Sequence, residues 1–231
     1  MRPAARRLLA GALLLGHSGP TGGCTGPDAG PAAASPTASP TAPATPTGPA
    51  GLEQLLLPDV PSGLPRVPDD ELDPPAGEKS LEDVAGYGGD ADRERGVLDD
   101  YGYRWGWERF WRSGDTQTSV FVDQFDDPVG ADAYAQDLRV NDGDYYGGRG
   151  AGTTDVTTDG TTDGTSALPT DCTVLTVERP APETRLTGPA AFAWCTEGVF
   201  TVSVTAVAAD PETARAELSA VVEAQLERLP G

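Results

Sequence analysis

The chain has 231 residues, enough for one domain of ordinary size or two small ones. It carries 36 acidic and 16 basic residues, and its formal net charge of −20 repels nucleic-acid phosphates, so neither DNA nor RNA is expected as a partner. The longest apolar run near the N-terminus covers residues 8–16, well short of the ~20 residues that a membrane-spanning helix needs.

The first 24 residues have the layout of a secretory signal peptide. Three arginines and no acidic residue precede the apolar run, and small residues then lead to Cys24. The sequence Thr21-Gly22-Gly23-Cys24 is similar to a bacterial lipobox, although an aliphatic residue usually stands where this chain has Thr21. The two other cysteines can pair with each other, which leaves Cys24 to carry a lipid. We therefore predict a signal peptide over 1–23 and membrane attachment through an acylated Cys24, with ordinary secretion as the alternative.

Residues 24–56 are predicted to form a lipid-anchored stalk. Pro, Ala and Thr dominate its first part, 25–50, which has too little apolar surface to offset the entropy of ordering. A Pro-rich composition also keeps such a segment extended. The stalk would hold a folded domain, predicted over 57–231, away from the bilayer.

The domain begins with two short helical segments. Ser80-Leu-Glu-Asp83 is a helix start of the capping-box type, and Asp90 to Tyr101 fits a second helix. Alternating residues then predict strands over 104–111 and 118–125, joined by a turn at 113–115. Asp127-Pro128 starts a helix that reaches Leu138.

A flexible acidic loop is predicted over 143–171, where Thr-Thr-Asp repeats three times. Three strands follow over 172–178, 190–195 and 199–208, and then a helix over 210–229 whose apolar stripe only Gln225 interrupts. This order favours an α+β domain in which helices pack on one side of an antiparallel sheet.

Cys172 and Cys195 lie in neighbouring predicted strands of an exported chain, the compartment in which disulfides persist. We predict a structural disulfide between them. A redox pair is the alternative, but no Cys-x-x-Cys spacing favours it.

The strand over 104–111 places Trp105, Trp107, Arg109 and Trp111 on one face. Aromatic rings there could stack on a sugar or another flat ligand, with Arg104, Arg109 and Arg112 holding an anionic group. The competing interpretation is that the rings cover the core and the arginines pair with surrounding carboxylates. We expect Trp107 to be core and keep Trp105, Trp111 and Arg109 as candidates for a ligand platform. Gly106 within the strand indicates a bulge or a close approach of other atoms.

No catalytic residue is predicted. The single histidine, His17, lies in the predicted signal peptide, which excludes Ser-His-Asp and Cys-His arrangements and histidine-ligated metals in the mature chain. No glycine-rich phosphate loop follows a strand, so no cofactor is expected. Asp155, Asp159 and Asp163 recur every four residues, which does not match a calcium-binding loop, so no metal site is expected either.

The chain as a whole resembles a group of actinobacterial cell-surface lipoproteins of unassigned chemistry. The resemblance rests on the lipobox-like Cys24, the Pro/Ala/Thr stalk, Gly-Tyr-Arg-Trp-Gly-Trp-Glu-Arg-Phe-Trp over 102–111, Phe-Asp-Asp-Pro over 125–128 and the closing Ala-Gln-Leu-Glu-Arg-Leu-Pro. It implies a lipid-anchored protein on the outer face of the cytoplasmic membrane and carries no site residue with it.

We therefore expect a non-enzymatic extracytoplasmic module that binds or senses a small molecule, a glycan or a protein. Two alternatives remain open. One is a carrier for a lipid or another apolar ligand, and the other is a structural envelope protein without a small ligand.

Overall fold

A computed structural model of the chain describes residues 44–146, 153–156, 168 and 171–230. The predicted signal peptide, Cys24 and most of the predicted stalk and acidic loop lie outside these residues. The helices are α1 (Pro49–Leu55), α2 (Leu81–Ala85), α3 (Ala91–Asp100), α4 (Pro128–Tyr146) and α5 (Pro211–Leu226), with short 3-10 helices at Asp69–Glu71 and Pro182–Thr184. The strands are β1 (Gly77–Lys79), β2 (Tyr103–Ser113), β3 (Thr116–Phe125), β4 (Thr153–Val156), β5 (Cys172–Val177), β6 (Ala190–Glu197) and β7 (Phe200–Val207).

The strands form one sheet in the order β1-β2-β3-β7-β6-β5-β4, and every neighbouring pair is antiparallel. Hairpins join β2 to β3 and β6 to β7, where Gly114 and Gly198 take the positive φ angles of 59° and 55° that tight turns require. The predicted α+β class and antiparallel sheet are confirmed.

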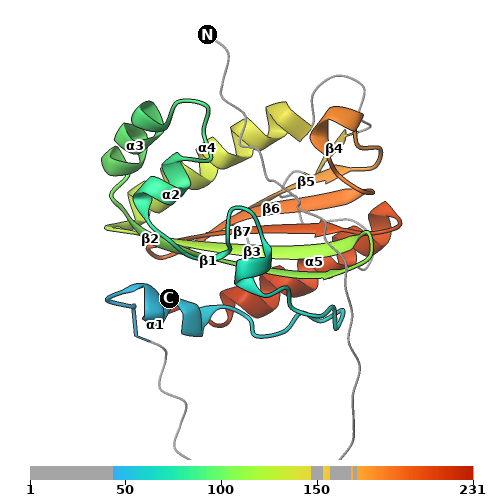
Figure 1. The fold of residues 1–231 in the computed structure, drawn as a ribbon, viewed down its shortest axis with the longest axis horizontal. Coiled ribbons are helices and arrows are strands. Elements are labelled where there is room, and N and C mark those ends of the chain that lie inside the picture. The colour runs from blue at the N-terminus through green and yellow to red at the C-terminus, as the bar shows by residue number, and fades with distance from the viewer. Residues whose placement is uncertain (1–43, 147–152, 157–167, 169–170, 231) are drawn as a thin grey trace, which may run out of the picture.

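Helices cover both faces of the sheet, which corrects the expectation of one covered side (Figure 1). Along β6, Ala193 and Cys195 belong to the core under α1 and α5, whereas Phe192 and Trp194 belong to the core under α2, α3 and α4. Successive side chains of a strand point to opposite faces, so a strand that is apolar at every position needs cover on both.

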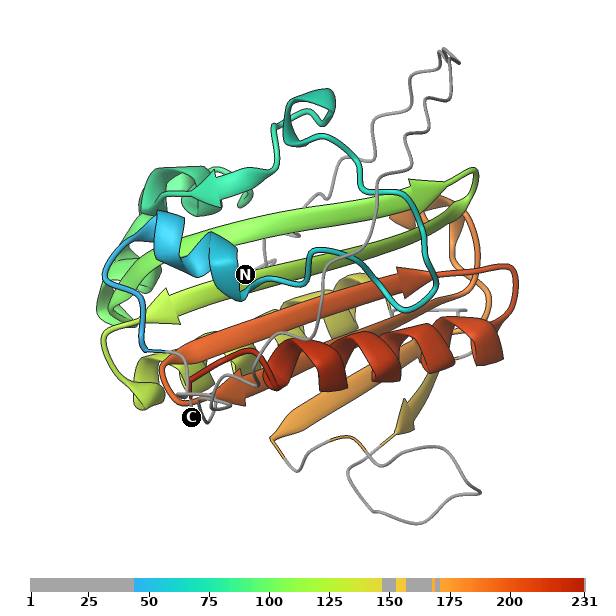
Figure 2. The same ribbon diagram turned by 90° about the horizontal axis from the view of Figure 1, so that it is seen from below.

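We call these two surfaces the α5 face and the α4 face. The α5 face carries the strand residues Trp107, Trp111, Val120, Val122, Val202, Val204, Ala193 and Cys195. The α4 face carries Glu108, Phe125, Leu175, Phe192 and Trp194. Figure 2 shows the α5 face from below, with α1 and α5 lying over the sheet.

The helix starts follow the predicted capping signals. Ser80 and Asp83 form a reciprocal capping box at α2, and the Asp210 side chain accepts a hydrogen bond from the Thr213 N–H at α5. At α4, the Asp127 carboxylate accepts from the Gly130 N–H at 2.9 Å. This helix continues to Tyr146, eight residues past the predicted end.

The folded domain begins earlier than predicted. Residues Pro49–Leu55 form α1 inside the segment assigned to the stalk, and Leu52 and Leu56 are 0% and 1% exposed in the core of the α5 face. The leucine-rich run supplies the apolar surface that the residues before it lack, which offsets the entropy of ordering. Within the predicted acidic loop, Thr153–Val156 forms the edge strand β4.

None of the helices in the described part of the chain combines the length and the hydropathy required to cross a bilayer.

Candidate functional sites

The predicted disulfide is present and joins two neighbouring strands. Cys172 of β5 and Cys195 of β6 are direct partners in the sheet register, and their sulfur atoms are bonded at 2.00 Å. Both residues are buried in the core of the α5 face. Because the chain has three cysteines, this pairing leaves Cys24 without an intrachain disulfide partner.

The aromatic strand does not present the predicted ligand platform. Trp111 is 0% exposed and its indole N–H donates to the Pro58 carbonyl oxygen at 3.4 Å, so a ligand has no access to it. Trp105 and Trp107 are half-buried and pack against the core of the α5 face, which fits the expectation of a core role for Trp107. Trp105 donates to the Gln124 side chain at 3.1 Å.

Arg109, the charged member of the predicted platform, is also buried. It is 4% exposed, and its Nη1 donates to the Leu57 carbonyl oxygen at 2.7 Å. Its Nη2 lies 3.6 Å from the Glu53 carboxylate. Burial lowers the pKa of the guanidinium. Arg109 therefore binds the chain's own N-terminal segment, and the idea that it holds an anionic ligand is corrected.

A buried ionic cluster lies on the α4 face, near the β1 edge of the sheet. Lys79 and Glu108 are 4% and 5% exposed, and the Lys79 Nζ lies 3.4 Å from the Glu108 Oε2. The Tyr87 hydroxyl donates to the Glu108 Oε1 at 2.7 Å, and Lys79 also donates to the Pro75 carbonyl oxygen. Burial raises the pKa of Glu108 to about 7, against the lowering effect of Lys79.

Asp123 completes the cluster from β3. It is buried, and it accepts a hydrogen bond from the Tyr103 hydroxyl at 3.2 Å. Gly106 pairs with Asp123 in the register, and a Cβ at Gly106 would overlap both the Asp123 carboxylate and the Tyr103 hydroxyl. The glycine predicted to mark a close approach therefore makes room for this cluster.

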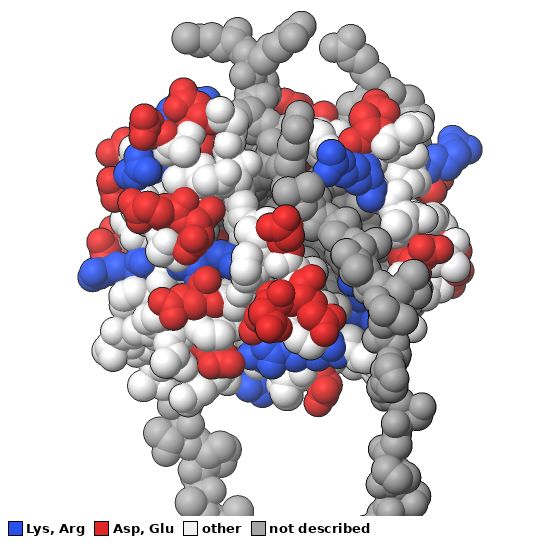
Figure 3. All heavy atoms as spheres, in the orientation of Figure 1, with Lys and Arg blue, Asp and Glu red and all other residues white. Residues whose placement is uncertain are grey.

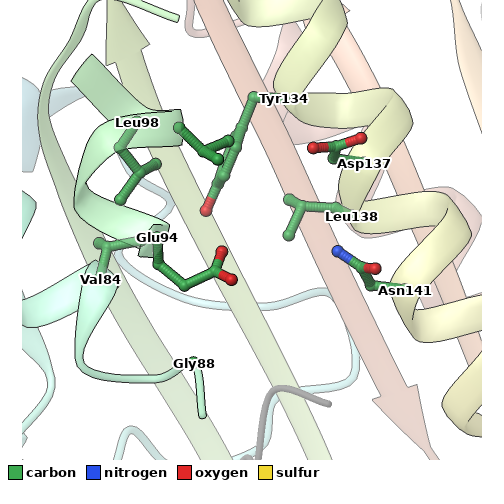
Figure 4. Close-up of a pocket in the computed structure, with 9 residues that line it drawn as sticks. Val84, Gly88, Glu94, Leu98, Tyr134, Asp137, Leu138 and Asn141 are labelled. Carbon is green, nitrogen blue, oxygen red and sulfur yellow. The ribbon is translucent and has the colours of Figure 1, made fainter. Parts of the chain in front are cut away.

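A small pocket opens between α2, α3 and α4 (Figure 4). Its volume is about 40 Å³, room for about three water molecules if each needs roughly 10–15 Å³. The apolar part of its wall comes from Val84, Leu98 and Leu138. Its polar groups come from Glu94, Asp137 and Asn141.

The surroundings of this pocket are acidic. The α3 helix carries four acidic residues against two basic ones, Arg93 and Arg95, and acidic side chains gather over this layer at the upper left of Figure 3; the acidic residues are Asp92, Glu94, Asp99 and Asp100. The Asp137 carboxylate accepts from the Tyr101 hydroxyl at 2.8 Å. Burial, and then this hydrogen bond, raise the pKa of Tyr101 to about 12. The pocket thus favours a cationic or hydrogen-bond-donating group over an anion.

The described residues contain no group of three or more His, Cys, Asp or Glu side chains placed to hold a metal ion. The lining residues of the pocket include Tyr134 besides the carboxylates of Glu94 and Asp137, and none of them is Ser, Thr, Cys, Lys or His. A pocket of this size and lining can bind a small polar group.

Sequence reasoning missed the buried ionic cluster, although the sequence contains a signal for it. Lys79 is the single lysine of the chain, and Glu108 stands within an aromatic strand. A charged side chain on a buried face of a sheet indicates an oppositely charged or hydrogen-bonding partner, because burying an unpaired charge is unfavourable. That the partner comes from β1, a strand of three residues, was not predicted.

No protein-family model and no curated protein sequence matches the chain. One solved structure that the chain matches is the extracellular domain of PknH from Mycobacterium tuberculosis. The two share 13% sequence identity with a TM-score of 0.44, and the match covers 78% of this chain and 97% of that domain.

Proposed function

We propose that the chain is a lipid-anchored extracytoplasmic protein whose folded domain binds or senses a ligand and catalyses no reaction. The proposed extracytoplasmic location is supported by the Cys172–Cys195 disulfide, because such bonds persist in oxidising compartments outside the cytoplasm. The same bond accounts for two of three cysteines and leaves Cys24, at the end of a signal-peptide pattern, to receive the lipid.

The binding role is supported by the pocket between α2, α3 and α4. It lies away from the predicted stalk's entry at α1, on the opposite side of the sheet (Figure 1). A domain held by its α5 side would thus present the pocket away from the anchor. The absence of catalysis is supported by the sequence, since the one histidine precedes Cys24.

The pocket between α2, α3 and α4 does not support the alternative of a lipid carrier. A cavity for a drug-sized apolar ligand measures roughly 300–1,000 Å³, whereas this pocket offers about 40 Å³ and has carboxylates in its wall. A structural envelope protein without a ligand remains the competing proposal, and the experiment on ligand binding separates the two.

The anchor is tested by expressing the full chain in an actinobacterial host beside a Cys24→Ala variant. We expect the unaltered chain to enter the detergent phase and its N-terminal peptide to begin at a diacylglycerol-modified Cys24. The variant should stay in the aqueous phase. An unmodified wild-type chain in the aqueous phase would contradict the anchor.

Ligand binding is tested by native mass spectrometry of the domain purified from that host. A bound small molecule that is lost on Asn141→Leu substitution would support binding at the pocket. The matched control is Asn141→Asp, which keeps the size of the side chain. A clean mass for the unliganded chain, with no ligand recovered from host extracts, would favour the structural alternative.

A further inference from the structure

Residues 46–58, which we name the docking segment, lie on the α5 face in contact with β2 and the C-terminal end of α5. They include α1 and the leucines that follow it, drawn in blue beside β2 in Figure 2. The apolar part of the contact comes from Leu52, Leu55, Leu56 and Leu57, all of which are buried. Leucines at i, i+3 and i+4 are the pattern by which a helical peptide binds an apolar surface.

The polar part of the contact consists of hydrogen bonds to the main chain of the docking segment. Gln225 is 0% exposed, its Nε2 donates to the Leu55 carbonyl oxygen at 3.0 Å, and its Oε1 accepts from the Leu57 N–H at 3.0 Å. The side chain therefore makes both hydrogen bonds that a neighbouring backbone amide would make. This explains why a glutamine interrupts the apolar stripe of α5.

Two arginines add bonds of the same kind. Arg228 donates from Nε to the Leu55 carbonyl oxygen at 2.9 Å and from Nη2 to the Gln54 carbonyl oxygen at 2.8 Å. Arg109 donates to the Leu57 carbonyl oxygen, as described above. The last carbonyls of a helix have no partner within the helix, so the two Arg228 donors cap the end of α1, and Arg109 binds the main chain just beyond it. Gln225, Arg228 and Arg109 thus share one task, which is to bind the main chain of the docking segment.

The docking segment is joined to the rest of the described chain by an exposed turn. The Gly63 N–H donates to the Val60 carbonyl oxygen at 2.9 Å, and Pro61, Ser62 and Gly63 are exposed. Within the described residues, 46–58 pair with no strand of the sheet. Side chains therefore hold the segment, as they hold a bound peptide, and the backbone ladder does not.

We propose that the surface formed by Arg109, Trp111, Gln225 and Arg228, the docking face, is a peptide-binding site. It is filled here by the chain's own docking segment and accepts the same segment from a second copy of the chain. Residues 46–58 already fit this face, through the buried leucines and through the main-chain hydrogen bonds. Opening of the exposed turn at 61–63 would let each copy pass its segment to the other, which is the exchange that produces segment-swapped dimers.

The first test cuts the connection and leaves the rest of the chain intact. A protease recognition sequence is inserted after Ser62, and the cleaved chain is incubated with a fluorescent synthetic peptide of residues 46–60. We expect the cleaved chain to keep its circular dichroism spectrum and to bind the peptide saturably in fluorescence anisotropy. A peptide with Leu52→Asp and Leu56→Asp should bind at least 50-fold more weakly, and this comparison requires no change in the protein.

A variant of the docking face provides the second test. Gln225→Leu removes both main-chain hydrogen bonds and should weaken the peptide at least tenfold. The matched control is Gln136→Leu at an exposed position of α4, which should leave the affinity unchanged. Failure of the unaltered peptide to exchange, unfolding of the chain when its own segment leaves, or equal binding of the Asp peptide would each overturn the proposal.

The identity of the occupant is tested on the uncleaved chain. Copies of two isotopic masses are mixed at high concentration and followed by native mass spectrometry. Mixed dimers that the synthetic peptide dissociates are the expected result. A chain that stays monomeric throughout, while the cleaved form binds the peptide, would overturn the second copy as the occupant.

Discussion

Raising the pH through neutrality is expected to destabilise the domain because of one buried carboxyl group. Glu108 lies among Lys79, Asp123 and Tyr87, and burial raises its pKa from 4.5 to about 7. Between these two values the folded chain binds more protons than the unfolded chain. The free energy of unfolding therefore falls as the pH rises through this window and stays lower above it.

The magnitude follows from the size of the shift. A pKa that is raised from 4.5 to about 7 corresponds to about 3 kcal/mol, at about 1.4 kcal/mol for each pH unit. Ordinary surface carboxylates, which form favourable contacts when folded, give the opposite slope. The contribution of Glu108 therefore has to be measured as the difference in unfolding free energy between the unaltered domain and a variant that lacks this carboxyl group.

The assay is urea unfolding at several values between pH 5 and pH 8, for the unaltered domain and for Glu108→Gln. We expect the difference in unfolding free energy between them to change by about 2–3 kcal/mol across this range, slightly less than the full shift, because at pH 5 most unfolded chains have already lost this proton. Glu82→Gln is the matched control, since the Glu82 side chain is 66% exposed beside Arg95. If the curves of the unaltered domain and Glu108→Gln run parallel, the assignment of the buried proton to Glu108 is refuted.

Three further changes test other parts of the fold. Replacing Cys172 and Cys195 by Ser should lower the free energy of unfolding by about 3 kcal/mol in urea, and no loss would show that the bond does not restrict the unfolded chain. Trp111→Ala should cost about 3–5 kcal/mol, because the ring is fully buried, and a cost under about 1 kcal/mol would contradict its core position. Gly130→Ala should lower the melting temperature, since the added Cβ would overlap a backbone carbonyl oxygen. Gly96→Ala should raise the melting temperature, because its Cβ meets nothing within 4 Å. A Gly130→Ala protein that melts at a higher temperature than Gly96→Ala would contradict the packing of α4.

Much of the fold could be predicted because its signals are local. Alternation over 104–111 and 118–125 predicts the β2–β3 hairpin, and the Asp-Pro pairs at 127–128 and 210–211 predict the starts of α4 and α5. Each signal depends on residues within a few positions of one another. The disulfide could also be predicted, since compartment and strand position limit how three cysteines can be used.

The candidate sites could be predicted only in part. The sequence places Trp105, Arg109 and Trp111 on one face, and the structure agrees, but it buries Trp111 and Arg109 under the docking segment. Sequence alternation identifies the members of a face and does not identify what covers that face. The same limit explains why the helices were expected on one side of the sheet.

The sequence by itself determines the acidic charge and predicts the secretory start, the strands and helices and the cysteine pair, because composition and short-range periodicity carry this information. Only the tertiary structure decides why charged or polar residues stand at Lys79, Glu108, Arg109 and Gln225. Each of these side chains is buried and has a partner in a segment that is distant in sequence. Gln225, for example, binds main-chain atoms 168 and 170 residues away. A buried polar group requires a partner, but the identity of that partner depends on how the chain folds back on itself.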